Sequence, residues 1–263
     1  MDLGLKNKKA LVTGASRGLG FATALALSGE GAQVAINARD AVRLQKAAGE
    51  IMRQTDGKIF ALPGDLALPD LASSLPLLAA EKLGGLDILV VNSGGPPPGR
   101  FEEFDDDAWQ KAINGLLMSA VRLIRAALPS LRASDSPSVL TVTSYSIKQP
   151  IPNLVLSNSI RAAVAGLTKT LALELGLEGI RVNSILPAWT ETERVQELIT
   201  DRARRSGATP EEETRKQAAE SALGRMSKPE EFARAAAFLC SPAASYLTGV
   251  MLPVDGGMYK GTF

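Results

Sequence analysis

Three glycines near the start of the chain have the spacing of a phosphate-binding turn. Gly14, Gly18 and Gly20 follow the apolar residues 10–12 and open a segment rich in alanine and leucine. A strand that enters a helix through such a turn directs unpaired backbone N–H groups and the positive helix end at one point. We expect Gly14 to permit the turn, Gly18 to admit a pyrophosphate and Gly20 to allow close helix packing. The pattern predicts a dinucleotide site, the alternative being an ordinary strand-to-helix turn.

Two arginines indicate which dinucleotide binds. In a dinucleotide fold the end of the second strand, here predicted at residues 33–36, lies beside the adenosine ribose. An acid at that position binds the 2′-hydroxyl of NAD(H), whereas an arginine accommodates the 2′-phosphate of NADP(H). The chain has Ala38 in place of the acid, followed by Arg39, and it carries Arg17 inside the turn. We therefore predict NADP(H) in preference to NAD(H), the alternative being that Arg39 is an ordinary surface residue.

The chain contains no histidine and one cysteine, Cys240. The absence of histidine removes the commonest general base, the commonest zinc ligand and every Ser-His or Cys-His nucleophile, and we expect no metal site. The absence of histidine thereby excludes most hydrolase mechanisms. The single cysteine excludes an internal disulfide. Cys240 ends an apolar run and is predicted to be a buried structural thiol.

Composition indicates one globular domain with small partners. The 263 residues, 45% of them hydrophobic, suffice for a single α/β domain over residues 1–263. The net charge of +1 provides no field that would attract nucleic acid or an anionic membrane. The first residues do not resemble a signal peptide, and no apolar run approaches the ~20 residues of a membrane span. We expect a cytoplasmic protein that binds small molecules or further copies of itself.

Apolar segments alternate with helix-forming segments along the chain. This order is typical of a doubly wound parallel sheet, whose strands are apolar because helices cover both faces. We expect Pro76 to end or kink a helix over residues 68–82. We predict about seven strands, near residues 10–12, 33–36, 58–61, 87–91, 138–143, 181–185 and 250–254.

Two segments are expected to border the ligand cleft. Residues 92–99 place three prolines between glycines at the carboxyl end of a strand, which predicts a stiff wall on the nicotinamide side. Residues 187–225 form a strongly charged insertion, and Thr209 with Glu212 has the spacing of a helix capping box. The insertion is therefore expected to be helical. A lid over the cleft and a solvated excursion both remain open.

The motif Thr13-Gly14-x-x-x-Gly18-x-Gly20 resembles the cofactor turn of the short-chain dehydrogenase/reductases. The resemblance runs nearly end to end and includes residues 91–94, 140–144, 180–183, 187–188 and 254–257. It implies a single-domain Rossmann-type fold with a helical lid, and it is nearest to the 3-oxoacyl-carrier-protein reductase branch. Together with the turn and the two arginines, it places the cofactor against Gly14, Ser16, Arg17, Gly18, Leu19, Gly20, Arg39, Asp65, Leu66, Asn92, Gly94, Arg161 and Thr192.

Members of this family use an asparagine, a serine and a Tyr-x-x-x-Lys pair. The serine holds the substrate oxygen, the tyrosine transfers the proton, and the lysine binds the nicotinamide ribose. The lysine, one helical turn from the tyrosine, lowers the pKa of the phenol from about 10. The matching positions in this chain hold Leu116, Ser144, Ser157 and Arg161. Only the serine, Ser144, is retained.

These replacements alter proton delivery. The hydroxyl of Ser157 cannot replace a phenol as a proton donor near neutral pH, and Arg161 can bind ribose hydroxyls without shuttling a proton. Tyr145 is a further candidate, although adjacent residues of an extended segment point to opposite sides. The candidate catalytic residues are therefore Ser144, Tyr145, Ser157 and Arg161.

Two functions remain open at this point. The first is an NADP(H)-dependent oxidoreductase for a carbonyl or alcohol substrate, with atypical or impaired proton delivery. The second is a non-catalytic NADP(H)-binding sensor or structural subunit. Apolar stripes over residues 109–124 and 160–175, with the family resemblance, favour a homodimer or homotetramer.

Overall fold

Seven parallel strands form one sheet in the order β3-β2-β1-β4-β5-β6-β7, which confirms the predicted fold class. The computed structural model describes residues 1–262. The strand order changes direction between β1 and β4, and ligands of open α/β sheets bind at such a point. The strands are β1 (Lys9–Val12), β2 (Gln33–Ala38), β3 (Ile59–Pro63), β4 (Ile88–Val91), β5 (Ser138–Val142), β6 (Arg181–Pro187) and β7 (Met251–Val254).

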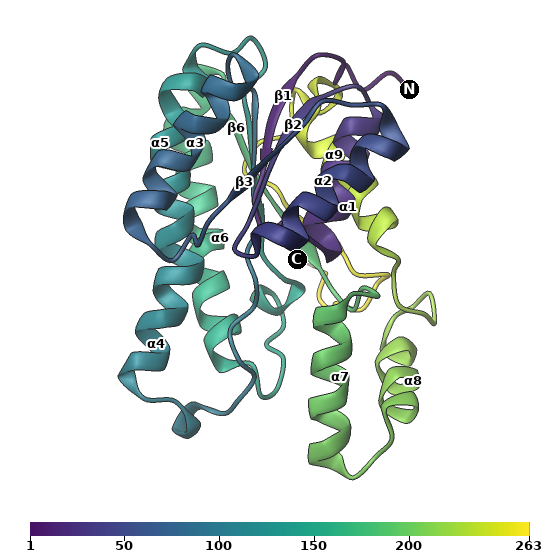
Figure 1. Ribbon diagram of the computed structural model, residues 1–263. Coiled ribbons are helices and arrows are strands. Elements are labelled where there is room, and N and C mark those ends of the chain that lie inside the picture. Colours follow the sequence, from purple (N-terminus) through teal and green to yellow (C-terminus); the bar gives the residue numbers. More distant parts are fainter. Residues whose placement is uncertain (263) are drawn as a thin grey trace.

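Helices cover both faces of the sheet, and a helical pair projects beyond its lower edge (Figure 1). One face carries α1 (Gly18–Gly29), α2 (Ala41–Thr55) and α9 (Pro229–Cys240). The other carries α3 (Pro69–Leu83), α5 (Ser119–Arg132) and α6 (Val155–Leu175). The remaining helical segments are α4 (Asp106–Ile113), a π-helical turn (Asn114–Met118), α7 (Glu193–Ser206), α8 (Pro210–Glu220) and short 3-10 turns at Phe101–Glu103, Tyr145–Ile147, Gly176–Glu178 and Pro242–Ala244.

The core lies on both sides of the sheet, and β4 shows why its sequence is apolar throughout. Ile88 and Val90 pack with α1, α2 and α9, whereas Leu89 and Val91 pack with α3, α5 and α6. Alternate side chains of a strand point to opposite faces, so a strand covered on both sides has no solvent-facing position. Cys240 is fully buried in the first of these clusters, as predicted.

Pro76 was expected to end or kink its helix, and the first of these alternatives is wrong. Helix α3 continues through Pro76 to Leu83. A proline removes one backbone hydrogen bond, and α3 retains the burial of Leu75, Pro76, Ala79 and Leu83 on the sheet side. Tertiary packing therefore overrides the local preference.

The segments α4, the π-helical turn and α5 form one helix, Asp106–Arg132, that is long and apolar enough by length and composition to cross a membrane. It does not contradict the expectation that no apolar run approaches the ~20 residues of a membrane span. The expectation considered uninterrupted apolar runs, whereas this helix has a mean hydropathy of 1.2 with polar residues interspersed. Leu123, Ile124, Ala127 and Leu131 of the helix pack into the domain core, and 39% of the apolar window is buried in the domain.

Both apolar stripes that suggested subunit contacts lie partly inside the domain. In residues 109–124, Leu116 and Ile124 are buried, and in α6 Ile160, Val164 and Leu175 are buried. Other members, among them Trp109, Leu117, Leu167 and Leu171, are only half-buried, so packing within one chain accounts for part of each stripe.

Candidate active site

The cofactor turn links β1 to α1 at the point where the strand order reverses. Gly14 and Gly18 have φ values of 58° and 57°, in the left-handed region that favours glycine. A Cβ on Gly20 would lie 2.3 Å from the carbonyl oxygen of Gly14. The close helix packing predicted for Gly20 therefore has a direct steric cause.

Asn92, directly after β4, stabilises this turn by hydrogen bonds. Its Nδ2 donates to the carbonyl oxygens of Thr13 at 3.3 Å and Gly14 at 3.1 Å. The hydroxyl of Thr13 in turn donates to the Asn92 carbonyl at 2.7 Å. These bonds hold the backbone that a pyrophosphate would approach, so Asn92 positions the turn and borders the same cleft.

A cleft of about 380 Å³ opens at the carboxyl ends of the central strands. It brings together residues that are distant in sequence. The predicted site residues that line it are Gly14, Arg17, Gly18, Leu19, Arg39, Asn92, Gly94, Ser144, Tyr145, Ser157, Arg161 and Thr192.

Four predicted cofactor residues do not line the cleft. Gly20 lies behind the turn, and Ser16 is half-buried within it. The carboxylate of Asp65 accepts a hydrogen bond from the Ala67 N–H at 3.0 Å, and Leu66 is buried in the core. The turn-capping alternative for Asp65 is thus observed, and its contact with adenine stays a prediction.

The adenosine end of the cleft is rich in arginine. Arg39 is exposed, borders the cleft, and forms no ion pair or side-chain hydrogen bond within residues 1–262. Arg17 pairs with Glu193, and Arg43 lies 3.4 Å from the same carboxylate. The hydrogen bond from Arg17 is the main reason that the pKa of Glu193 is lowered. Sequence analysis did not identify Arg43 as a residue near the cleft. Its place four residues after Arg39, at the start of the following helix, could have indicated it.

Ser144 and Ser157 reach the cleft from different elements. The hydroxyl oxygen of Ser144 accepts a hydrogen bond from the Ser146 N–H at 3.1 Å and so caps the 3-10 turn that follows β5. Ser157 lies in the first turn of α6 and accepts a bond from Arg161 Nε at 3.3 Å. Both hydroxyls therefore have fixed positions at the end of β5.

Arg161 connects α6 to the end of β5. Its Nη1 donates to the carbonyl oxygens of Val142 at 2.9 Å and Thr143 at 3.1 Å. Burial and, secondly, the positive charge of Arg194 lower the pKa of Arg161 to about 10. The guanidinium is consequently still charged at neutral pH.

Leu116, at the position predicted to match the family's asparagine, contributes no polar group. It lies in the π-helical turn, is 5% exposed, and packs with Ala112, Leu156 and Ile160. An apolar contact between two helices thus replaces the hydrogen-bonding residue.

Tyr145 borders the same cleft as Ser144, which contradicts the expectation that the two point to opposite sides. The backbone forms a 3-10 turn at Tyr145–Ile147, so the alternation of an extended strand does not apply. Burial, followed by the charge of Glu220, raises the pKa of the Tyr145 phenol. This shift is opposite to the one that the family's lysine produces, and it makes Tyr145 a weaker acid.

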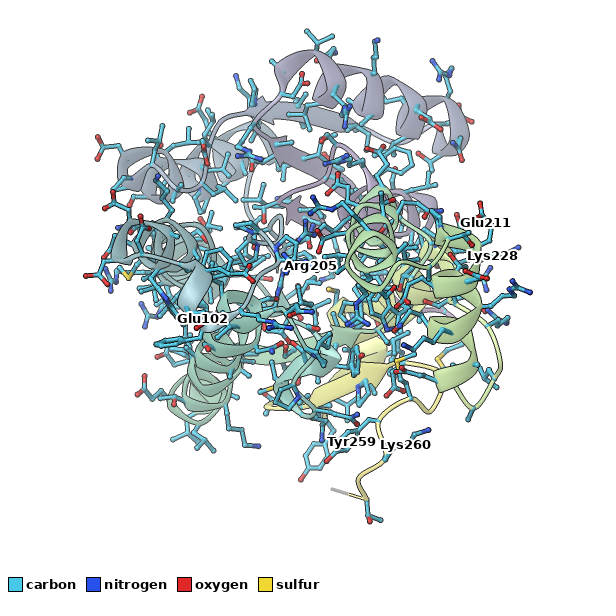
Figure 2. All side chains as sticks on the ribbon, turned by 90° about the horizontal axis from the view of Figure 1, so that it is seen from below. Glu102, Arg205, Glu211, Lys228, Tyr259 and Lys260 are labelled. Carbon is cyan, nitrogen blue, oxygen red and sulfur yellow. The ribbon has the colours of Figure 1, made fainter. Side chains whose placement is uncertain are left out.

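The insertion is helical, and the first residues of α7 border the cleft. The hydroxyl of Thr192 caps α7 by accepting a bond from the Val195 N–H at 3.3 Å. At the same end, Arg194 Nη2 donates to the Pro96 carbonyl at 2.6 Å, which joins α7 to the proline loop. At the other end Arg205 lies 3.4 Å from Glu103, and Figure 2 shows Arg205 near the centre of the view from below. Helix α7 is therefore joined to the proline loop near its first turn and to the Phe101–Glu103 turn near its last.

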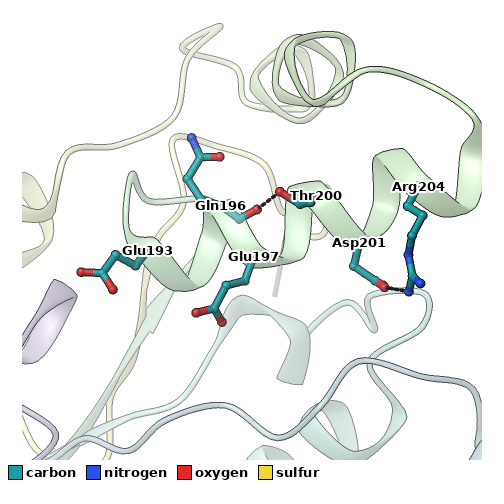
Figure 3. A pocket seen from close by; sticks show the side chains of 6 residues that line it. All are labelled: Glu193, Gln196, Glu197, Thr200, Asp201 and Arg204. Atoms are coloured by element: carbon teal, nitrogen blue, oxygen red, sulfur yellow. Dashed lines mark hydrogen bonds and ion pairs between the residues drawn. The ribbon is translucent and has the colours of Figure 1, made fainter.

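A second, shallow depression lies on the surface of α7 (Figure 3). All of its lining side chains come from this one helix, and Arg204 and Asp201 are paired within it at 2.8 Å. Because no other element contributes, it is a helix surface and not a ligand site.

A parallel sheet in this order, a glycine turn at its switch point and a serine after β5 define a nicotinamide-dependent oxidoreductase. The chain belongs to the short-chain dehydrogenase/reductase family. A family model described as enoyl-(acyl carrier protein) reductase matches residues 14–259. The 7alpha-hydroxysteroid dehydrogenase of Escherichia coli (strain K12) is 34% identical over 256 residues, 97% of this chain and 96% of the relative.

Other relatives agree on the family and differ in substrate. Dehydrogenase/reductase SDR family member 4 of Sus scrofa is 32% identical over 257 residues, covering 96% of this chain and 88% of the relative. The structure of L-sorbose reductase from Gluconobacter frateurii, complexed with NADPH and L-sorbose, superposes with a TM-score of 0.94. It is 32% identical, and the match covers 99% of this chain and 100% of that one.

Proposed function

We propose that the protein is an NADP(H)-dependent oxidoreductase that interconverts a carbonyl and an alcohol with atypical proton delivery. The observation that supports the preference for NADP(H) is Arg39 at the cleft, which forms no ion pair within residues 1–262. Arg17 lines the same cleft, and Ala38 stands in place of an acid. Two structural relatives, L-sorbose reductase and actinorhodin polyketide ketoreductase, are NADPH complexes, which supports the same preference.

The residues present fit such a cofactor. The backbone N–H groups at Gly14, Gly18 and Leu19 would hold the pyrophosphate at the start of α1. A side chain at Gly14 would not fit there, because its Cβ would lie 2.8 Å from Asn92 Nδ2. Arg17 and Arg39 would hold the 2′-phosphate, and Thr192 would close over the turn. The bound nicotinamide supplies or accepts the hydride.

Ser144 is the candidate for holding the substrate oxygen, since it retains the family's residue and lines the cleft. The hydroxyl of Ser157 and the charge of Arg161 lie on the same wall and would stabilise negative charge on that oxygen. None of Ser144, Ser157 and Arg161 is an efficient proton donor near neutral pH, and the pKa of Tyr145 is raised. Water in the cleft is therefore the proposed proton source, and turnover is expected to be slow.

The alternative is an NADP(H)-binding protein without turnover, acting as a sensor or structural subunit. The burial of Leu116 favours it, because the asparagine position has become part of a helix contact. The two functions are separated by titrating the protein with NADPH and then following NADPH oxidation with simple ketones and a 3-oxoacyl thioester. Binding with slow product formation supports the oxidoreductase, binding without any product supports the alternative, and absence of NADPH binding contradicts both.

Three further properties belong to this proposal. We propose a cytoplasmic homodimer or homotetramer, and the exposed Leu173 and Leu177 at the end of α6 provide apolar surface for it. A monomer by light scattering at micromolar concentration would contradict this assembly. We also propose that residues 187–225 move as a lid, because two of the contacts that hold α7, Arg17 with Glu193 and Arg205 with Glu103, are weak ion pairs between solvent-accessible side chains.

A further inference from the structure

The buried face of helix α8 is polar. Its two buried residues are Glu213, which is 4% exposed, and Gln217, which is 1% exposed. The other charged residues of α8 are exposed. A surface helix ordinarily packs through an apolar face. Because a buried ion pair adds little net stability over an apolar contact, stability alone does not explain why α8 buries the carboxylate of Glu213.

Glu213 holds an arginine of the neighbouring helix. Its carboxylate accepts a hydrogen bond from Gln217 Nε2 at 2.7 Å and lies 3.6 Å from Arg202 Nη1. Arg202 belongs to α7, which runs beside α8 in Figure 1. Within residues 1–262 its guanidinium forms no other ion pair and no side-chain hydrogen bond. Glu213 and Gln217 therefore determine where this positive charge lies.

The guanidinium of Arg202 lies over the ring of Trp189. The distance from Arg202 Cζ to the ring centroid is 4.9 Å, which is within the range of a cation–π contact. The indole N–H of Trp189 has no acceptor in hydrogen-bond geometry among the described residues. The ring otherwise packs in an apolar cluster that includes Ile199 and Met226. Arg202 is therefore the charged group that fixes the plane of the ring.

Trp189 also forms part of the wall of the cleft. The other cleft-lining residues of its apolar cluster include Tyr145, Ile151, Leu154 and Leu198. Burial and then the charge of Glu220 raise the pKa of the Tyr145 phenol, and the Trp189 N–H and the Arg202 charge oppose this rise. The contacts thus continue from α8, through Arg202 and Trp189, to the residues that border the cleft.

We propose that Arg202 and Glu213 are positioning residues that hold the Trp189 indole as a wall of the cleft, and that the substrate places an apolar group against this wall. The inference rests on the proposed function, because it concerns the carbonyl substrate of the same cleft. It gives the insertion a role in specificity that requires no contact between α8 and the substrate. A ketone with an aromatic group gains more from this flat apolar surface than a ketone with short alkyl groups.

The first test measures how firmly the ring is held. The chain has two tryptophans, so Trp109→Phe leaves Trp189 as the only one. In this background, acrylamide quenching of Trp189 should rise about two- to fivefold in Arg202→Gln, the factor expected for loss of a cation–π contact. Arg202→Lys keeps a cation and should show a smaller rise. Glu213→Gln should resemble Arg202→Gln, and the double variant should exceed neither, since both changes act through one contact.

The second test measures what the held ring selects. Calorimetry in the presence of NADP⁺ gives the dissociation constants of 4-phenylbutan-2-one and butan-2-one without turnover. The wild-type protein should bind the aryl ketone about ten- to a hundredfold more tightly, as expected for burial of a phenyl group. In Arg202→Gln and Glu213→Gln this ratio should fall about two- to fivefold, with the affinity for butan-2-one nearly unchanged. Arg204→Gln and Glu211→Gln, at exposed positions of the same two helices, should leave both readouts unchanged.

Unchanged quenching in Arg202→Gln would overturn the inference, as would a wild-type affinity ratio in a variant whose Trp189 has become accessible. An equal loss of affinity for both ketones would also overturn it, because general destabilisation of the insertion would then be the cause. The proposed function fails separately. Selective binding of the aryl ketone that depends on Arg202, without NADPH oxidation, would uphold the inference and reject catalysis. NADPH-dependent reduction with an unchanged ratio in Arg202→Gln would uphold the function and reject the inference.

Discussion

Arg17, in the cofactor turn, forms an ion pair with Glu193, the first residue of α7 and 176 positions later in the chain. The same carboxylate lies 3.4 Å from Arg43. The start of α7 is thereby held against the glycine turn through an arginine that is predicted to bind the 2′-phosphate. A phosphate arriving there would compete with Glu193.

Glu193→Gln should therefore raise the affinity for NADPH more than that for NADH. Removing a competing exposed ion pair should change affinity about two- to fivefold, because such pairs are weak. Calorimetric titration of both cofactors measures the effect. Glu211→Gln, an exposed acid on α8 shown in Figure 2, is the matched control. An equal gain for NADPH and NADH would indicate general loosening of the lid and contradict the competition.

Arg39→Asp should reverse the cofactor preference. The wild-type protein should bind NADPH about ten- to a hundredfold more tightly than NADH, as expected for one charge-assisted contact to a phosphate. Aspartate repels the 2′-phosphate and can accept a bond from the 2′-hydroxyl. Arg53→Asp on the exposed side of α2 makes the same charge change away from the cleft and should preserve the order. Equal wild-type affinities, or a preference for NADH, would refute the assignment.

Ser157→Tyr combined with Arg161→Lys should raise the rate of NADPH-dependent reduction. Restoring a phenol beside an ammonium supplies the missing general acid, whose absence typically costs about 10² to 10⁴ in rate while binding persists. Single-turnover absorbance of NADPH gives the rate. Ser157→Ala, which adds no proton donor, is the comparison. Fast turnover in the unmodified protein that falls on Ser157→Ala would show that our account of proton delivery is wrong, and abolition by Tyr145→Phe would identify Tyr145 as the acid.

Gly20→Ala should destabilise the fold and abolish cofactor binding together. The added Cβ would lie 2.3 Å from the Gly14 carbonyl oxygen and 2.7 Å from Asn92 Nδ2. Such overpacking costs about 1–3 kcal/mol. Gly49→Ala, in α2, meets nothing within 4 Å and should stabilise the protein by about 0.4–1 kcal/mol. Urea unfolding of the two variants tests this, and similar midpoints would contradict the steric argument.

Cys240 should resist thiol reagents in the folded protein. Its ionisation in the unfolded chain should lower the free energy of unfolding at high pH. Burial raises its pKa to about 12, whereas an unfolded cysteine ionises near ~8.5. Because the folded pKa is the higher, the contribution is intact below about pH 8.5 and is lost as pH rises toward 12, by up to about 1.4 kcal/mol per pH unit. Unfolding of wild type and Cys240→Ala between pH 8 and 10 isolates this difference. A constant difference would contradict it, as would rapid labelling of the native thiol.

Several features of this protein follow from local sequence. The turn at Gly14, Gly18 and Gly20 is recognisable because its glycines are needed by backbone geometry within a few residues. The apolar strands are recognisable because a sheet covered on both faces leaves them no polar position. The capping box of Thr209 and Glu212 was predicted, and both of its hydrogen bonds are present at 3.2 and 2.9 Å. The sequence likewise predicts, from Ser157 and Arg161, that the family's tyrosine and lysine are replaced.

Only the tertiary structure decided which of these groups meet and in what environment. The pairing of Arg17 with Glu193 joins segments far apart in the chain, and local periodicity contains no information on such a contact. Pro76 stays inside α3 because packing on the sheet outweighs a local backbone preference. Tyr145 enters the cleft because the chain turns directly after Ser144. The repulsion between Arg161 and Arg194 depends on a separation and a burial that arise only when α6 and α7 are placed at the same cleft.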